Sequence, residues 1–186
     1  AVGHTLEVAE SLECLRGGGP DDLRELVTLL GGELLHLSGV ASSEEEGRAK
    51  IESALDSGRA LAAFEAGVEA QGGDVAALEA EGGLPGAPDR EHLCADATGY
   101  VNFTDCAAIG RAVGSLGGGR THLGDEIDMG VGLVLTKQQG DPVDAGEPLC
   151  AIHHRGGVGL EEARSQLLAA IEVADSPEVE PLVLDG

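Results

Sequence analysis

Large aromatic side chains are nearly absent from this sequence of 186 residues. It has no tryptophan, one tyrosine and two phenylalanines, so its core has to be built from aliphatic side chains without the contact area that aromatic rings supply. The apolar fraction of 42% is still enough for a core, which argues against a disordered chain. The 30 glycines predict many turns and places where two backbones approach closely.

Positive charge is also scarce. The chain has 11 Lys and Arg against 34 Asp and Glu, a formal net charge of −23, and its only lysines are Lys50 and Lys137. Binding to nucleic-acid phosphates needs clustered Lys and Arg, so the composition argues against a nucleic-acid partner. An anionic membrane surface would repel the chain for the same reason. We therefore expect a well-solvated acidic surface.

Several features of a secreted or membrane protein are missing. The cysteines contain no Cys-x-x-Cys pair, which predicts free or buried thiols in a reducing compartment, the cytoplasm. No apolar run is long enough to span a bilayer, and no signal-peptide pattern is present. The chain opens at Ala1 in a predicted loop that runs into a helix, which suggests a piece of a longer polypeptide. The four cysteines are Cys14, Cys94, Cys106 and Cys150.

The first half has the apolar periodicity of four helices. The first ends at the glycines 17–19, and the second runs from Pro20 to a stop at Gly39. Ser43 is predicted to cap the third helix, and Ser57 the fourth. Two glycines inside the second helix, residues 31 and 32, predict either a kink or another backbone packed against that spot.

The second half changes character after a Gly/Pro-rich joint at residues 81–92. Short strands are expected at 94–96, 100–103, 131–136 and 149–153, and Asp105 is expected to cap a helix. A last helix should carry Leu160 to Ile171, and residues 179–184 should form a closing edge strand, because Pro181 excludes a central position. The predicted domains are residues 1–88 and 89–186.

Eleven short motifs stand in order along the chain: VGHTLEVAE (2–10), GPDDLREL (19–26), LDSGRA (55–60), AQGGD (70–74), AIGRA (108–112), LGGGR (116–120), DEID (125–128), VG (131–132), GDPV (140–143), GEPL (146–149) and IH (152–153). This ordered set resembles the C-terminal portion of thymidine and pyrimidine-nucleoside phosphorylases. The resemblance covers nearly the whole chain and is weakest from residue 76 to 91.

The resemblance implies a fold, a reaction and partners. The fold would be α/β (α+β): a helical layer of a larger α/β domain, followed by a β-rich C-terminal domain of barrel-sandwich-hybrid type with a closing helix. The reaction would be phosphorolysis of a pyrimidine nucleoside by phosphate, giving the free base and a pentose 1-phosphate, in a homodimer without an organic cofactor. The family holds phosphate and base through segments that precede the position of Ala1. This chain offers no substitute for them, so by itself it should be inactive.

One ligand set carries over from the resemblance. Bacterial members bind a monovalent cation, usually potassium, through main-chain carbonyls and one glutamate. The matching positions here are the carbonyl of Ala1 and the carboxylate of Glu10. A hard cation suits oxygen ligands of this kind. The competing interpretation is that Glu10 is one of several solvated acids on its helix.

Other patterns carry less chemistry. His153 and His154 are adjacent and would point to opposite faces of a strand, so they do not easily share a metal. The glycines 117–119 before Arg120 lack the Gly-Lys-Ser/Thr of a phosphate loop and are predicted to stop a helix. Residues 140–149 resemble the hairpin of biotinyl and lipoyl carrier domains, but no lysine follows Lys137. Surface or capping roles are expected for the carboxylates Asp105, Asp125, Glu126 and Asp128.

Two classes of function follow. The first is a portion of a pentosyl-transferring phosphorylase. The second is a non-enzymatic sandwich-hybrid module with helical flanks, serving as a binding or structural unit. A third, an independent helical adaptor, would need an upstream stretch without a phosphate-binding loop.

Overall fold

The computed structural model describes residues 1–80, 82–120, 122–179 and 181–183. The chain folds into two compact units. Of the described residues, one unit comprises Ala1–Glu7 and the chain from Leu84 to residue 179, and the other comprises the chain from Val8 to Gly83 and residues 181–183. The two units are described separately, and the domain boundary at residue 88 stays a prediction. Among the described residues, no helix combines the length and the apolar character needed to cross a membrane.

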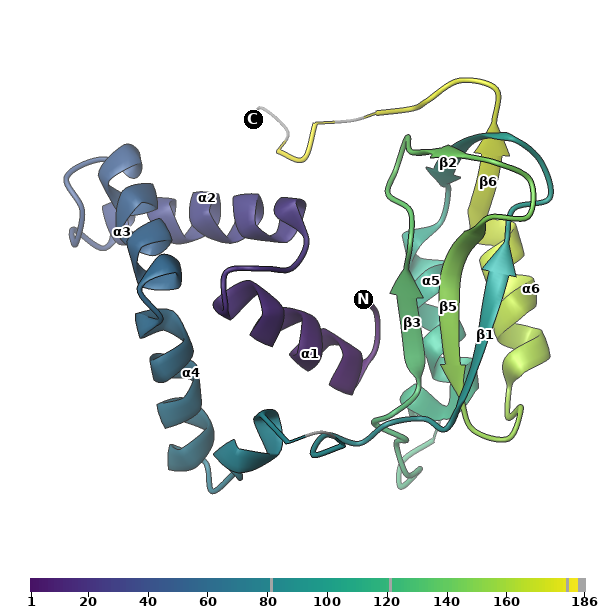
Figure 1. The fold of residues 1–186 in the computed structure, drawn as a ribbon, viewed down its shortest axis with the longest axis horizontal. Coiled ribbons are helices and arrows are strands. Elements are labelled where there is room, and N and C mark those ends of the chain that lie inside the picture. The colour runs from purple at the N-terminus through teal and green to yellow at the C-terminus, as the bar shows by residue number, and fades with distance from the viewer. Residues whose placement is uncertain (81, 121, 180, 184–186) are drawn as a thin grey trace. The chain divides into compact units, whose positions relative to one another are not determined.

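The helical unit contains most of α1 (His4–Leu15), then α2 (Asp21–Leu37), α3 (Glu44–Asp56) and α4 (Arg59–Ala70), and ends in a 3-10 turn, η1 (Val75–Leu78) (Figure 1). The four predicted helices are therefore confirmed. As predicted, Ser43 caps α3 by accepting a hydrogen bond from the Glu46 backbone N–H at 3.2 Å. The Glu46 carboxylate reaches back to the N–H of Ser42 at 2.8 Å, one residue before the position usual in a capping box.

The prediction for Ser57 is wrong. Its hydroxyl donates to the carbonyl of Ser53 at 2.6 Å, so Ser57 closes α3. The residue before α4 is Gly58, in the left-handed conformation (φ 75°), without a side-chain cap. A hydroxyl side chain can satisfy a preceding carbonyl as readily as a following N–H, and sequence spacing does not separate the two uses.

Glycine lets α2 and α3 approach backbone to backbone. A Cβ atom on Gly32 would lie 2.7 Å from the backbone nitrogen of Arg48, and one on Gly47 would lie 2.9 Å from the Gly32 Cα. Both distances are too short for a real contact. The close packing predicted at residues 31 and 32 is thus confirmed, and α2 continues through the glycines as one helix.

The β-rich unit has two three-stranded antiparallel sheets, ordered β1-β5-β3 and β4-β2-β6. Its elements in chain order are β1 (Asp89–Cys94), β2 (Gly99–Phe103), α5 (Cys106–Val113), a π-helical turn η2 (Gly114–Gly118), β3 (Gly132–Leu135), β4 (Pro142–Val143), β5 (Pro148–His154), α6 (Leu160–Ala170) and β6 (Ile171–Ala174). The predicted mixed α/β class is confirmed. Within the described residues, the strands do not close into a barrel.

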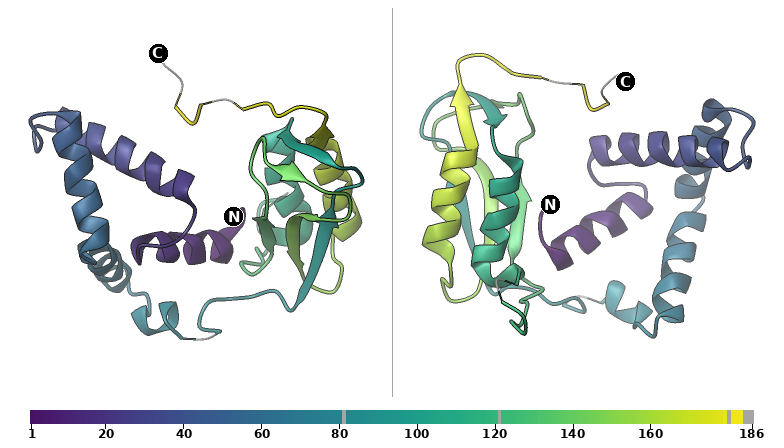
Figure 2. Two further views of the ribbon diagram at one scale, coloured as in Figure 1. Left: turned by 45° about the horizontal axis from the view of Figure 1, so that its top comes forward. Right: turned by 180° about the vertical axis from the view of Figure 1, so that it is seen from behind.

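Helices α5 and α6 lie side by side on one face of this unit (Figure 2). Its core is aliphatic, as the scarcity of aromatic residues requires. Asp105 caps α5 as predicted, since its carboxylate accepts from the Ala108 N–H at 2.9 Å. The side chains with no exposed surface include Val101, Val131, Leu133, Ile152 and Leu167.

Three predicted boundaries or elements of this unit need correction: the first strand, the end of the last helix and the closing strand. The first strand is Asp89–Cys94, not 94–96. The end of the Gly/Pro-rich joint predicted at residues 81–92 therefore belongs to this strand and pairs with β5. The last helix ends at Ala170, and Ile171 opens β6. No strand forms at residues 179 and 181–183, whereas residues 180 and 184 lie outside the described residues. The closing edge strand is β6, which pairs with β2.

We expect Gly47→Ala to lower the free energy of unfolding by about 1–3 kcal/mol, because the new methyl group would force α3 away from Gly32. Urea unfolding followed by far-UV circular dichroism measures this change. The control is Gly67→Ala in α4, where a Cβ atom meets nothing within 4 Å. This control should be neutral or stabilising by up to about 1 kcal/mol. Equal effects of the two substitutions would contradict the close packing.

Candidate functional site

The first residues of the chain are tied to β3. The Val2 N–H donates to the Leu133 carbonyl at 2.8 Å, and the Leu133 N–H donates to the Val2 carbonyl at 2.7 Å. This reciprocal pair is one rung of an antiparallel ladder. Ala1, the predicted carbonyl ligand, therefore immediately precedes a backbone segment that is fixed on a buried strand.

Two glycines make this approach possible. A Cβ atom on Gly3 (φ +129°) would lie 2.8 Å from the Val131 carbonyl oxygen, and one on Gly132 (φ +156°) would lie 2.5 Å from the Val2 carbonyl oxygen. We call this contact between residues 2–3 and 131–133 the glycine crossing. The glycine crossing was not predicted from the sequence. The Val-Gly pairs at residues 2–3 and 131–132 are two of four in the sequence, so the pair gives no signal for this contact.

The N-terminus of α1 is held by side chains as well. The Glu7 carboxylate accepts from the Gly3 N–H at 2.8 Å, which satisfies a donor at the start of the helix. The His4 ring donates from Nε2 to the Gly118 carbonyl at 2.7 Å. The backbone N–H of Thr5 donates to the Met129 carbonyl at 3.2 Å. Glu7, which sequence analysis grouped with solvated acids, thus has a structural role.

Glu10, the predicted carboxylate ligand, lies in α1 and is half-buried. Among the described residues, no group of three or more His, Cys, Asp or Glu side chains could hold a metal ion. This finding leaves open a site made of main-chain carbonyls and one glutamate, such as the family resemblance implies. The cation role of Ala1 and Glu10 stays a prediction.

The glycine-rich segment after α5 ends a helix, as predicted. Gly117 has φ +96°, and its carbonyl accepts from the Asp128 N–H at 3.0 Å. The neighbouring Gly118 carbonyl is taken by His4. Arg120 donates from Nε to the Asp125 carbonyl at 3.2 Å. The segment therefore directs carbonyl oxygens and one arginine into its own loop, an arrangement that does not favour phosphate.

The predicted capping and surface roles of the carboxylates hold for Asp105 and Asp128. Asp105 caps α5 and pairs with Arg111 at 2.9 Å; the Ala108 N–H and this arginine hold its pKa below the ordinary value. Asp128 pairs with the Arg155 Nε at 2.6 Å, and this hydrogen bond lowers the pKa of the Asp128 carboxyl group. Neither carboxylate is kept protonated for acid catalysis.

The adjacent histidines point to opposite faces of β5, as predicted. His154 is 6% exposed and its Nδ1 accepts from the Gly157 N–H at 3.2 Å, while its Nε2 has no hydrogen-bond partner among the described residues. Its nearest carboxylate oxygens, on Asp89 and Glu91, lie 4.0 and 3.9 Å away. Burial lowers the pKa of His153. Within the described part of the chain, neither ring belongs to a cluster of three or more His, Cys, Asp or Glu side chains that could hold a metal ion.

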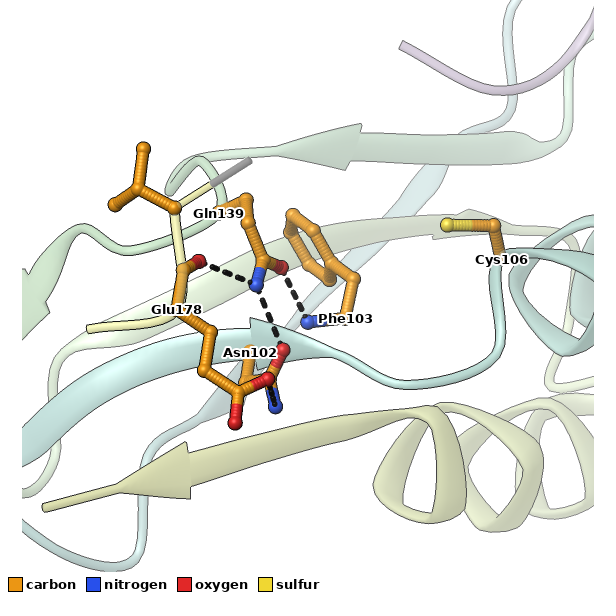
Figure 3. A pocket seen from close by; sticks show the side chains of 6 residues that line it. Asn102, Phe103, Cys106, Gln139 and Glu178 are labelled. Atoms are coloured by element: carbon orange, nitrogen blue, oxygen red, sulfur yellow. Dashed lines mark hydrogen bonds between the residues drawn. The ribbon is translucent and has the colours of Figure 1, made fainter. Parts of the chain in front are cut away.

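A small hollow lies where the C-terminal tail meets the second sheet (Figure 3). The Gln139 amide links three segments: its oxygen accepts from the Phe103 N–H at 2.7 Å, and its Nε2 donates to the Asn102 side-chain oxygen at 2.7 Å and the Glu178 carbonyl at 2.8 Å. The Cys106 thiol lies at the rim. These hydrogen bonds, together with one from the Asn102 amide to the Glu178 carboxylate at 3.2 Å, fasten the tail to β2.

Residues 140–149, which resemble the hairpin of carrier domains, do not pair with one another as a hairpin. Their two strands belong to different sheets, because β4 pairs with β2, whereas β5 pairs with β1 and β3. The turn at Gly146 (φ 88°) therefore passes the chain from one sheet to the other. The cysteines Cys14, Cys94, Cys106 and Cys150 are all free thiols, as predicted, and burial raises the pKa of Cys150 to about 11.

Comparison with known proteins points to one family. Residues 100–174 match the pyrimidine nucleoside phosphorylase C-terminal domain. Over 184 residues, the chain is 36% identical to a pyrimidine-nucleoside phosphorylase of Geobacillus stearothermophilus, with 99% of this chain and 42% of the relative covered. It is 40% identical to the thymidine phosphorylase of Homo sapiens over 176 residues, covering 90% of this chain and 36% of the relative. The chain thus spans less than half the length of these curated relatives, and the resemblance drawn from its motifs is confirmed.

The Asp128–Arg155 pair predicts a pH-dependent contribution to stability. Because the folded state lowers the pKa of Asp128, the contribution is present above the ordinary aspartate pKa and is lost as the pH falls through the folded value. The side chains of Arg155 and Asp128 are 53% and 27% exposed, so we expect less than about 1 kcal/mol. Urea unfolding of Asp128→Asn at pH 7 and pH 3 measures it, with exposed Asp96→Asn as control. A deficit that is larger at pH 3 would contradict the assignment.

Proposed function

We propose that this chain, which is related over nearly its whole length to pyrimidine-nucleoside and thymidine phosphorylases, is the supporting C-terminal portion of such a phosphorylase. The observation that carries the proposal is the combined match: residues 100–174 fit the C-terminal domain, and similarity to a full-length relative extends over 99% of this chain. The names of these relatives give the proposed substrate class, a pyrimidine nucleoside.

In the proposed reaction, a phosphate oxygen attacks the anomeric carbon of the nucleoside. The bond from that carbon to the pyrimidine nitrogen breaks, and its electron pair leaves with the base, which takes up a proton. The products are the free base and a pentose 1-phosphate. No electrons are exchanged with a cofactor, and we propose none of the organic kind. As in the family, the complete enzyme would be a cytoplasmic homodimer.

The charges of this chain support the proposal that phosphate is bound by the rest of the enzyme and not by this portion. Phosphate capture needs cationic groups, and both lysines are engaged elsewhere. Lys50 pairs with Glu46 at 2.5 Å, and Lys137 pairs with Glu147 at 3.1 Å and donates to the Pro142 carbonyl at 3.0 Å. A chain with a net charge of −23 also repels free phosphate. The engaged lysines and the net charge support a proposal in which the portion that this chain does not cover captures the anion. Base recognition is assigned to that portion by the family resemblance.

We also propose that the Ala1 carbonyl and the Glu10 carboxylate contribute to a potassium site of the complete enzyme. The support is the family pattern of carbonyl ligands with one glutamate. The reciprocal hydrogen bonds of Val2 with Leu133 add to it, because they hold the backbone next to Ala1 rigid. Oxygen ligands suit a hard monovalent cation.

Activity is tested by joining this chain to the catalytic portion of the Geobacillus stearothermophilus relative, the part outside the match. We expect release of thymine or uracil from thymidine or uridine plus phosphate by the joined protein, and none by this chain alone. Chromatography of the free base measures both. Turnover by the chain alone would contradict the proposal that the rest of the enzyme binds phosphate. A folded joined protein that releases no base would favour the non-enzymatic module.

The cation proposal predicts that Glu10→Gln in the joined enzyme raises the potassium concentration for half-maximal activity by about tenfold or more, since one oxygen ligand loses its charge. The matched control is Glu13→Gln, an exposed glutamate on the same helix. Its potassium dependence should stay within about twofold of the unsubstituted enzyme. An unchanged response of Glu10→Gln would remove that residue from the site.

A further inference from the structure

Helix α2 has an apolar face that the described residues leave exposed. Val27, Leu30, Leu34 and Leu37 recur at intervals of three and four residues, so they lie along one side of the helix. Their exposed fractions are 39%, 48%, 66% and 74%. We call these four residues the α2 stripe. Val40, just after the helix, is 59% exposed and follows them in sequence.

The other side of α2 is already occupied. Thr28 and Gly32 are buried there, and Gly32 and Gly31 lie against Arg48 and Ile51 of α3. The helix is therefore anchored by close packing on one side while its leucine-rich side faces away from α3. The α2 stripe is therefore exposed on a helix that is already packed against α3 on its other side.

Single exposed leucines are ordinary on protein surfaces, but the α2 stripe is continuous over about three helical turns. A continuous apolar strip on an otherwise highly charged chain marks an interaction site. Glu33 is exposed on the same helix, as are Asp21 and Asp22 in its first turn. A fitting partner would therefore offer apolar side chains for the stripe and Lys or Arg at the rim.

The comparisons indicate which partner this is. The match to the C-terminal domain begins at residue 100, whereas the match to the Geobacillus stearothermophilus relative covers 99% of this chain and so includes α2. Helix α2 thus belongs to the part shared with whole phosphorylases, of which more than half lies outside the match. A second copy of this chain would bring another net charge of −23 to the interface.

We propose that the α2 stripe is the surface on which the catalytic portion of the phosphorylase docks. The inference rests on the proposed function and deepens it by naming the contact. It makes a differential prediction: a charge within the stripe should be harmless in this chain alone, where the stripe is exposed, and harmful in the joined protein, where the stripe is covered.

The test introduces Leu34→Glu in both forms and uses Leu168→Glu as the matched control. Leu168 lies in α6 and is 58% exposed, close to the 66% of Leu34. In this chain alone, both variants should melt within about 1 °C of the unsubstituted chain. In the joined protein, Leu34→Glu should lower the melting temperature by about 5 °C or more, and Leu168→Glu should not. Thermal unfolding by circular dichroism measures all four.

Size-exclusion chromatography with light scattering, on this chain mixed with the separately expressed catalytic portion, is the second measurement. We expect a complex that Leu34→Glu weakens by about tenfold or more and Leu168→Glu leaves intact. Equal tolerance of both substitutions, or no binding in either form, would overturn the docking surface. Self-association of the chain alone that Leu34→Glu abolishes would overturn it in favour of a second copy.

The outcome for the docking surface is separable from that for the proposed function. A joined protein that is sensitive to Leu34→Glu but releases no base keeps the surface and rejects phosphorolysis. An active joined protein that is indifferent to Leu34→Glu keeps phosphorolysis and rejects the surface.

Discussion

Both compact units depend on places where two backbones meet at glycine. In the β-rich unit, Gly3 and Gly132 bring the start of the chain onto β3, and in the helical unit, Gly32 and Gly47 bring α2 onto α3. A chain with only three aromatic residues cannot fill wide gaps between elements with large rings. Removing the side chain at the contact and bringing the backbones together achieves dense packing with small residues instead. The abundance of glycine and the scarcity of aromatics are thus two aspects of one packing solution.

The glycine crossing also bears on the proposed cation site. Main-chain carbonyls bind a monovalent cation well only when the backbone holds their oxygens in place, because ordering a mobile segment would cost conformational entropy on binding. The reciprocal hydrogen bonds of Val2 and Leu133, and the capping of the Gly3 N–H by Glu7, supply that order without the ion. A substitution at Gly132 could therefore affect the Ala1 carbonyl without touching a ligand.

Helix caps formed by neighbouring residues were predictable from the sequence, whereas the pairing of segments far apart in the chain was not. The caps at Ser43 and Asp105 follow from residues three positions apart, and both were predicted correctly. The start of β1 at Asp89 depends on its ladder with β5, whose partner His154 is 65 positions later in the chain. Ser57 failed because one hydroxyl has two local partners available. The glycine crossing was not predicted because its two segments, residues 2–3 and 131–133, are far apart in sequence and meet only in the fold.

The same distinction applies to function. The residues that carry the family resemblance lie mostly in helices and glycine turns, and such residues specify architecture rather than chemistry. Two of the four candidate carboxylates, Asp105 and Asp128, are paired with arginines that lower their pKa values, and both lysines are paired with glutamates. The excess of acidic residues leaves a net charge of −23, so this portion can brace an active site without competing for its phosphate. The α2 stripe is an apolar strip on this acidic surface.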